Sequence, residues 1–218
     1  SSEERFYNPK NFKNIEKNVA EFAKLAKEVS RDTPISPDGD VSIGLIAGEF
    51  SREAANAAQV LKWGQRPYAR NVLRSMTQYC IACHTKNTNG PQFVGLSEAP
   101  SFLPVGSLDR ANYYSAVREF DRAFAEYLKI IEQEKSAPSV SLNWEKAVRM
   151  ALAVGVRVKK DPDLSMKVVT AVLDTKNAPL YLKEQASIWK GSVEKWKKEK
   201  PIPANEEALF QASQRLVQ

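Results

Sequence analysis

Apolar residues recur along most of this chain at the spacing of an α-helix. Between residues 11 and 30 they stand three or four positions apart, with lysines and glutamates between them. The apolar positions are Phe12, Ile15, Val19, Phe22, Leu25 and Val29. Residues three and four apart share one face of a helix, whereas a strand alternates at every second residue. The segment therefore predicts an amphipathic helix.

Proline and glycine interrupt this pattern and predict where the next elements begin and end. Residues 41–50 fit either a short strand or a buried helical turn, and Ser51 is expected to cap a helix that reaches Trp63. Gly64 ends that helix, and Pro67 is suited to the first turn of the next one. We expect this next helix to continue without a break through residue 84.

The second half of the chain is also predicted to be helical. Ser107 is expected to cap a helix whose apolar stripe runs from Leu108 to Ile131. Residues 136–139, Ser-Ala-Pro-Ser, form the clearest boundary. Further helices are expected at 142–159, 163–173, 179–199 and 205–217. No 34-residue period relates them, so a plain helical bundle describes them better than a repeat array.

Five consecutive residues carry the most specific chemistry. Cys80, Cys83 and His84 form a C-x-x-C-H motif and are the only cysteines and the only histidine among 218 residues. This motif is the attachment signature of c-type haem. Helix positions i and i+3 share a face, so both thiols can meet one edge of a porphyrin, and the histidine that follows becomes the proximal iron ligand.

Three other uses of this motif fit less well. Structural zinc needs four protein ligands and catalytic zinc needs three plus water, but the chain has no second cluster of Cys or His. A thioredoxin-like dithiol is expected beside a βαβ unit, whereas these surroundings are helical in pattern. A disulfide between Cys80 and Cys83 would close a very small loop and constrain little. Covalent haem is the favoured interpretation.

On these residues the chain resembles the monohaem c-type cytochromes. The resemblance is specific at Cys80, Cys83 and His84 and weaker across the rest of residues 65–96. In the common soluble branch of that family a Gly-Pro pair follows the motif, and the proline carbonyl accepts a hydrogen bond from the proximal imidazole. Gly90 and Pro91 match this pair by type and order, although an ordinary turn explains them equally well.

The sixth iron ligand is left open by the sequence. The family usually supplies a methionine sulfur, and Met150 follows His84 at a spacing similar to the usual one, although it lies in a predicted helix and also suits a core position. Met76, on the helix of the motif, is better explained by core packing, and Met166 is likewise expected in the core. A lysine, a tyrosine, a terminal amine or an open coordination position are the alternatives.

The residues around the motif suggest how a haem would be surrounded. An apolar stripe through Val72, Met76 and the two cysteines predicts a porphyrin that lies against the interior. The Pro-rich residues 87–107 are expected to form a loop over one haem edge. Arg66, Arg70 and Arg74 recur every four residues and suit a docking surface, partners for the haem propionates, or a solvated face.

The fold is therefore expected to be all-α, with a helical haem-binding domain over residues 1–136 and a helical extension over 137–218 that offers a docking region. The chain is 43% hydrophobic and 27% charged, which is typical of folded globular proteins. No apolar run approaches the ~20 residues that span a bilayer. Its net charge of +6 is diffuse, which suits an acidic protein partner better than nucleic acid.

The resemblance implies a one-electron carrier with one covalent haem c and its iron, and not an enzyme. Its partners would be a redox protein or a membrane respiratory or photosynthetic complex. A haem-based ligand binder or sensor with an open sixth position is the alternative. A peroxidase-like enzyme ranks lowest, because no second histidine is available for acid–base work. Haem attachment in this family occurs outside the cytoplasm, so a periplasmic location with the signal peptide removed is expected.

Overall fold

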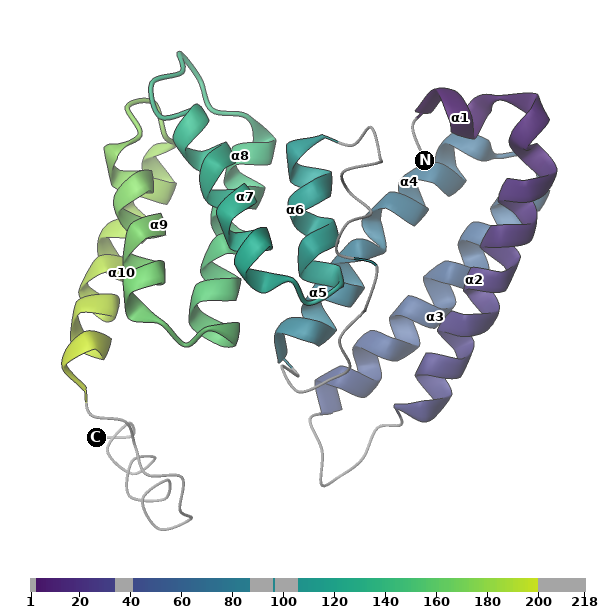
Figure 1. The fold of residues 1–218 in the computed structure, drawn as a ribbon, viewed down its shortest axis with the longest axis horizontal. Helices are drawn as coiled ribbons and strands as arrows, with labels where there is room; N and C mark the ends of the chain where they lie inside the picture. The colour runs from purple at the N-terminus through teal and green to yellow at the C-terminus, as the bar shows by residue number, and fades with distance from the viewer. Residues whose placement is uncertain (1–2, 34–40, 87–95, 97–105, 200–218) are drawn as a thin grey trace, which may run out of the picture.

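Helices are the only regular secondary structure in the part of the chain that the structure describes, which confirms the all-α class for those residues (Figure 1). This computed structural model describes residues 3–33, 41–86, 96 and 106–199. Pro91, most of the expected loop over the haem edge and the helix expected at 205–217 lie outside the described residues.

The N-terminal helices form one side of the molecule. Short elements α1 (Glu3–Tyr7) and η1 (Pro9–Asn11) lead into α2 (Phe12–Asp32), which confirms the first predicted helix, and α3 (Val41–Lys62) lies beside α2 (Figure 1). Residues 41–50 are the start of α3, so the strand alternative is wrong. Ser51 lies inside α3 and does not cap it, because one buried stripe continues through that position. The stripe consists of Ala47, Ala54, Ala57 and Leu61.

Gly64 ends α3, as the sequence predicts. Its backbone φ of +78° lies in the left-handed region that residues with a Cβ atom rarely adopt. The Gly64 amide donates to the Leu61 carbonyl at 3.0 Å, and the Gln65 amide donates to the Val60 carbonyl at 3.0 Å. This pair of bonds is a Schellman motif, which satisfies the last carbonyls of the helix.

Replacing Gly64 by alanine is expected to lower the free energy of unfolding by about 1 kcal/mol, because alanine must adopt the left-handed conformation. A Cβ atom there meets no other atom within 4 Å, so the cost is conformational and not steric. Gly191, inside a C-terminal helix and equally open, is the matched control. Gly191→Ala should raise stability by about 0.5–1 kcal/mol in urea unfolding. Equal effects of the two changes would contradict this account.

The helix that carries the C-x-x-C-H motif is broken, which corrects the expectation of one continuous helix. The structure has α4 (Arg66–Ser75) and α5 (Thr77–Lys86), with Met76 between them. The Ser75 hydroxyl donates to the Val72 carbonyl at 2.8 Å, and the Thr77 hydroxyl donates to the Arg74 carbonyl at 3.2 Å. Such side-chain bonds compete with the helical backbone bonds at the break.

The stripe from Leu108 to Ile131 is also divided between two helices, α6 (Ser107–Ala116) and α7 (Phe120–Gln133). Arg118 turns the chain between them with a φ of +63°. The Glu119 amide donates to the Tyr114 carbonyl at 2.8 Å, which is a Schellman closure without a glycine. The N-cap of α6 is Gly106, so the cap predicted at Ser107 is displaced by one residue.

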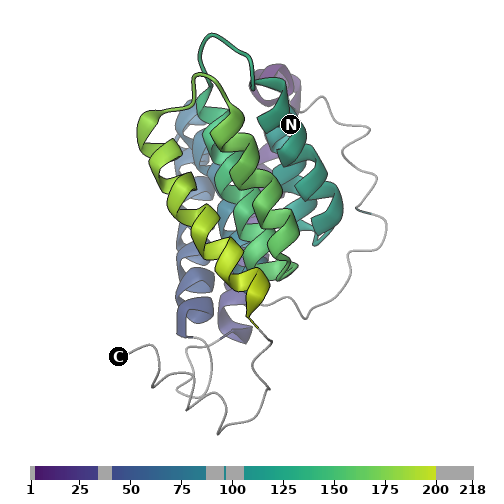
Figure 2. The same cartoon turned by 90° about the vertical axis from the view of Figure 1, so that its left-hand side faces the viewer.

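The C-terminal helices follow the predicted segments closely. They are α8 (Leu142–Ala153), a π-helical turn η3 (Val154–Val158), α9 (Pro162–Asp174) and α10 (Leu180–Lys198). Figure 2 views the molecule from the side on which α9 and α10 lie next to each other. The Ser141 hydroxyl accepts a hydrogen bond from the Trp144 amide at 3.2 Å and caps α8.

The largest buried core takes residues from α6 and α7 as well as from α8, α9 and α10. Tyr127, Trp144, Val168 and Leu182 are all fully buried in it. A second cluster joins α2, α3 and α4 around Leu61. The division of the chain at residues 136 and 137 stays a prediction, and the packing places α6 and α7 with the C-terminal helices.

Candidate functional site

The C-x-x-C-H motif lies on α5, with Cys80, Cys83 and His84 all half-buried. Both cysteines are free thiols, so they do not form the disulfide considered above. The fully buried side of α5 is made by Ile81 and Thr85, and the Thr85 hydroxyl donates to the Ile81 carbonyl at 2.7 Å. The prediction that the two thiols continue the buried stripe is therefore wrong: both are only partly buried, and the buried face is made by Ile81 and Thr85.

Helix α3 lies along one side of the motif. The Tyr79 ring contacts the Phe50 ring with 6.2 Å between centroids, and the Lys86 ammonium donates to the Ser42 hydroxyl at 2.5 Å. These two contacts show that α3 and α5 run antiparallel. The turns of α3 around Ser42 expose Val41 and Leu45, which are 45% and 54% exposed. The start of α3, the helix that packs against α5, thus carries exposed apolar side chains.

The turn between α6 and α7 lies on the side of His84. Burial lowers the pKa of His84 from its ordinary value, and the nearby Arg118 guanidinium lowers it further, while a hydrogen bond with the Ala116 backbone acts in the opposite direction. The neutral imidazole is therefore favoured, and this is the form that binds a metal. Sequence reasoning missed Arg118, because left-handed turn positions are usually recognised by glycine or asparagine.

The two thiols are favoured in their protonated form. Burial raises the pKa of Cys80, with a smaller opposing effect of its backbone hydrogen bond. Burial also raises the pKa of Cys83, and Arg118 opposes this rise. Reactive dithiols of redox enzymes need a lowered thiol pKa, so this environment does not favour a thioredoxin-like role.

The residues present fit a covalently attached haem. Two free thiols three positions apart and an adjacent neutral imidazole provide both kinds of bond that the group requires. Arg118 supplies a positive charge near both Cys83 and His84. In the described ranges, no group of three or more His, Cys, Asp or Glu side chains is placed to hold a metal ion by itself.

The three methionines lie in three different places. Met76 is 2% exposed and packs with Ala26 and Ala54, which confirms its prediction as a core residue. Met150 lines a groove between α8, η3 and α10, together with two tryptophans of α10, Trp189 and Trp196. Met166 lines a separate depression between α7 and α9. The assignment of Met150 as an iron ligand stays a prediction.

The arginine row on α4 ties helices together. The Arg66 guanidinium pairs with Glu16 of α2 at 2.9 Å and lies 3.3 Å from the centroid of the Phe12 ring. Arg70 pairs with Glu3 of α1 at 3.6 Å. The side chains of Arg66 and Arg70 are only 16% and 14% exposed, so the interpretation as a solvated face is wrong for these two. Arg74, which is more exposed, pairs with α6 instead.

Comparison with known proteins yields no matching family model, no matching curated protein and no matching solved structure. Within the described ranges, none of the helices combines the length and apolar character needed to cross a bilayer.

Proposed function

We propose that this chain is a monohaem c-type cytochrome that carries one electron. One observation supports this most strongly: the only two cysteines and the only histidine of the chain lie together on one helix turn, with both thiols free. The favoured neutral form of His84 and the exposed apolar side chains at the start of α3, the helix that packs against α5, agree with it. Haem attachment explains why all three residues stand in this one motif better than chance placement does.

Each residue of the motif has a distinct role in this proposal. Cys80 and Cys83 would hold the haem through two thioether bonds, and His84 would bind its iron. When bound, the haem supplies an iron that accepts and releases a single electron. The chain fixes the position of α5 through Ile81 and Thr85 in the interior and through the contact of Tyr79 with Phe50. A rigid α5 keeps the imidazole in one orientation in both redox states.

The partner and the location belong to the same proposal. A positively charged carrier is attracted to an acidic docking surface, and the net charge of +6 supports such a partner. The partner would be a soluble redox protein or a membrane respiratory or photosynthetic complex, reached in the periplasm. Helices α8 to α10 would provide additional docking surface.

A ligand-binding haem protein is the second candidate. In this candidate Met150 stays in the groove that it lines with Trp189 and Trp196 of α10 and does not bind iron. If no side chain occupies the sixth position, the iron would be open to small molecules.

Carbon monoxide separates these two functions. We expect the reduced protein to give sharp α and β absorption bands that carbon monoxide does not change, because an electron carrier holds a six-coordinate iron. A broad spectrum that shifts with carbon monoxide would replace the proposal by the ligand binder. A one-electron potentiometric titration of the same sample checks that the haem cycles reversibly.

Replacing His84 by alanine is expected to leave haem covalently bound, because both thiols remain, but to change the Soret band and the reduced spectrum. The physical reason is loss of the only imidazole in the chain. Tyr79→Phe is the control, because it keeps the ring that contacts Phe50 and should leave the spectrum unchanged. An unaltered spectrum in His84→Ala would remove the proximal ligand from the proposal.

A further inference from the structure

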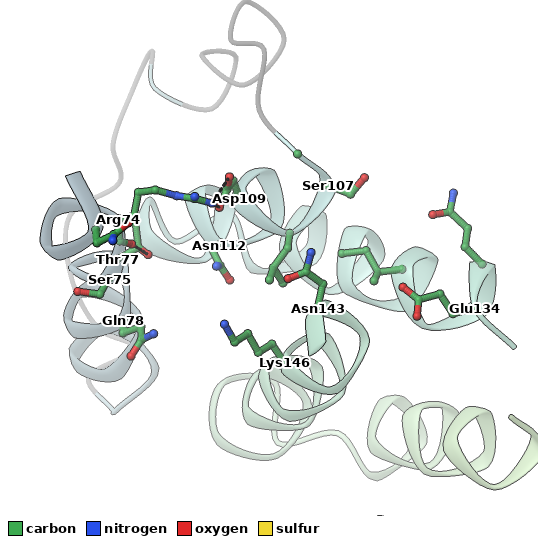
Figure 3. A pocket seen from close by; sticks show the side chains of 15 residues that line it. Arg74, Ser75, Thr77, Gln78, Ser107, Asp109, Asn112, Glu134, Asn143 and Lys146 are labelled. Carbon is green, nitrogen blue, oxygen red and sulfur yellow. Dashed lines mark hydrogen bonds and ion pairs between the residues drawn. The ribbon is translucent and has the colours of Figure 1, made fainter. Parts of the chain in front are cut away.

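A polar cleft of about 500 Å³ lies away from the motif, where the junction of α4 and α5 faces α6, α7 and α8 (Figure 3). Most of its lining side chains carry amide, hydroxyl or charged groups, and Leu108 and Ile130 supply a small apolar floor. This volume is within the usual range for small-molecule sites. A lining of this polarity suits a hydrophilic ligand.

The two carboxylates of the cleft are already bound to other groups of the protein. Both Asp109 oxygens lie near the Arg74 guanidinium, at 3.3 and 3.5 Å. One Glu134 oxygen accepts from the Ser141 amide at 2.6 Å, and the other accepts from the Ser141 hydroxyl at 2.7 Å. These carboxylates are thus occupied by Arg74 and by the start of α8.

Lys146 supplies a positive charge that none of these contacts uses. Its side chain extends from α8 toward Asn112 on α6 and Gln78 on α5, as Figure 3 shows. Among the described residues no ion-pair partner of Lys146 is present. The ammonium is therefore available to a negatively charged ligand group.

Asn112 is held in an orientation that suits the same ligand group. The buried Tyr127 hydroxyl donates to the Asn112 side-chain oxygen at 2.7 Å. Because that oxygen is occupied, the amide nitrogen is the group that can donate to a ligand. Lys146 and Asn112 together present a cation and a fixed hydrogen-bond donor to one space.

This cleft is separate from the proposed haem site. Gln78 lies about 160° around α5 from Cys80 and about 140° from Cys83, given about 100° per residue. Cys80, Cys83 and His84 are not among the residues that line the cleft, and its occupation does not require haem.

We propose that the cleft binds a small organic acid. Its carboxylate pairs with the Lys146 ammonium and accepts from the Asn112 amide nitrogen. Hydroxyl or amino groups of the same molecule bond to the amides of Gln78 and Asn143, both of which line the cleft. Its short carbon skeleton covers Leu108 and Ile130. This inference is independent of the proposed electron carrier.

Calorimetric titration of the full chain, as purified, with citrate, L-malate and L-glutamate in separate experiments tests the proposal. We expect saturable one-to-one binding of at least one acid. Lys146→Gln should weaken it about tenfold or more, because a charge-assisted bond is lost. Asn112→Asp should weaken it as strongly, since aspartate still accepts from Tyr127 but repels a carboxylate. The control Lys190→Gln removes an exposed lysine of α10 and should leave the affinity unchanged.

Three results would overturn the inference. The first is absence of saturable binding with all three acids. The second is equal affinity of the wild type and Lys146→Gln. The third is inorganic phosphate binding as tightly as the best acid with the same dependence on Lys146, which would show a site for a bare anion. Failure of haem attachment would leave all three results interpretable, so this test and that of the proposed function are distinguishable.

Discussion

A chain in which Cys80 and Cys83 are both replaced by serine is expected to retain no haem after denaturation. The chain has no other thiol, so no second route to a thioether exists. The two side chains are half-buried on the surface of α5 and do not form part of its core face, which consists of Ile81 and Thr85. The exchange of sulfur for oxygen should therefore remove attachment while the helix is preserved.

Haem staining of a denaturing gel and the mass of the intact polypeptide measure this loss. We expect stain in the wild type, weaker stain in each single variant and none in the double variant. Ala82→Ser is the matched control, because it introduces the same hydroxyl between the two thiols and keeps both of them. Stain of equal intensity in the double variant and the wild type would show that the haem is not attached through these two thiols. Absence of stain in both would show that the chain carries no covalent haem.

The sequence predicts helices well where one apolar stripe faces one partner. Helix α2 was expected at 11–30 and spans Phe12–Asp32, and α9 and α10 also begin and end within a few residues of their predicted positions. In each of these segments the apolar periodicity agrees with the breakers at the ends of the helix. Gly64 illustrates the same agreement, since its backbone has the left-handed φ that a glycine stop requires.

Two helix breaks were missed because no glycine or proline marks them. Met76 separates α4 from α5, and Arg118 separates α6 from α7, yet the apolar spacing continues across both. At Arg118 the chain adopts a left-handed φ with a side chain present, at a cost of about 1–2 kcal/mol that surrounding packing must offset. Packing between separate helices determines where these two breaks fall. The local pattern of apolar residues carries no information about that packing.

Part of the candidate site can likewise be predicted from the sequence, and part is visible only in the fold. The donor set of Cys80, Cys83 and His84 is local in sequence, so the motif alone identifies it. The neighbours Phe50 and Arg118 come from residues about 30 positions away on either side, and only the fold brings them to α5. The cleft around Lys146 collects its lining from five helices and has no signature in the sequence.

Trp144→Ala is expected to lower the free energy of unfolding by about 3–5 kcal/mol, the usual cost of deleting a large buried aromatic side chain. Trp144 is fully buried in the largest core, and its indole nitrogen donates to the Ile131 carbonyl at 3.2 Å. This bond joins α8 to α7 across residues 136 and 137, where the sequence predicts a domain boundary. Urea unfolding measures the loss. Trp63→Ala, at a side chain that is 65% exposed, should change stability by no more than about 0.5 kcal/mol.

Hydrogen exchange of the same Trp144→Ala variant tests whether α7 and the C-terminal helices share one core. Tyr127 of α7 and Val168 of α9 belong to the same buried cluster as Trp144. A cavity at Trp144 should therefore reduce the protection of amides in α7 and α9 together, because segments that share a core open cooperatively. Reduced protection in α8 to α10 alone, with α6 and α7 unchanged, would instead favour a domain boundary after residue 136. A loss of less than about 1 kcal/mol would contradict the central position of Trp144 in the core.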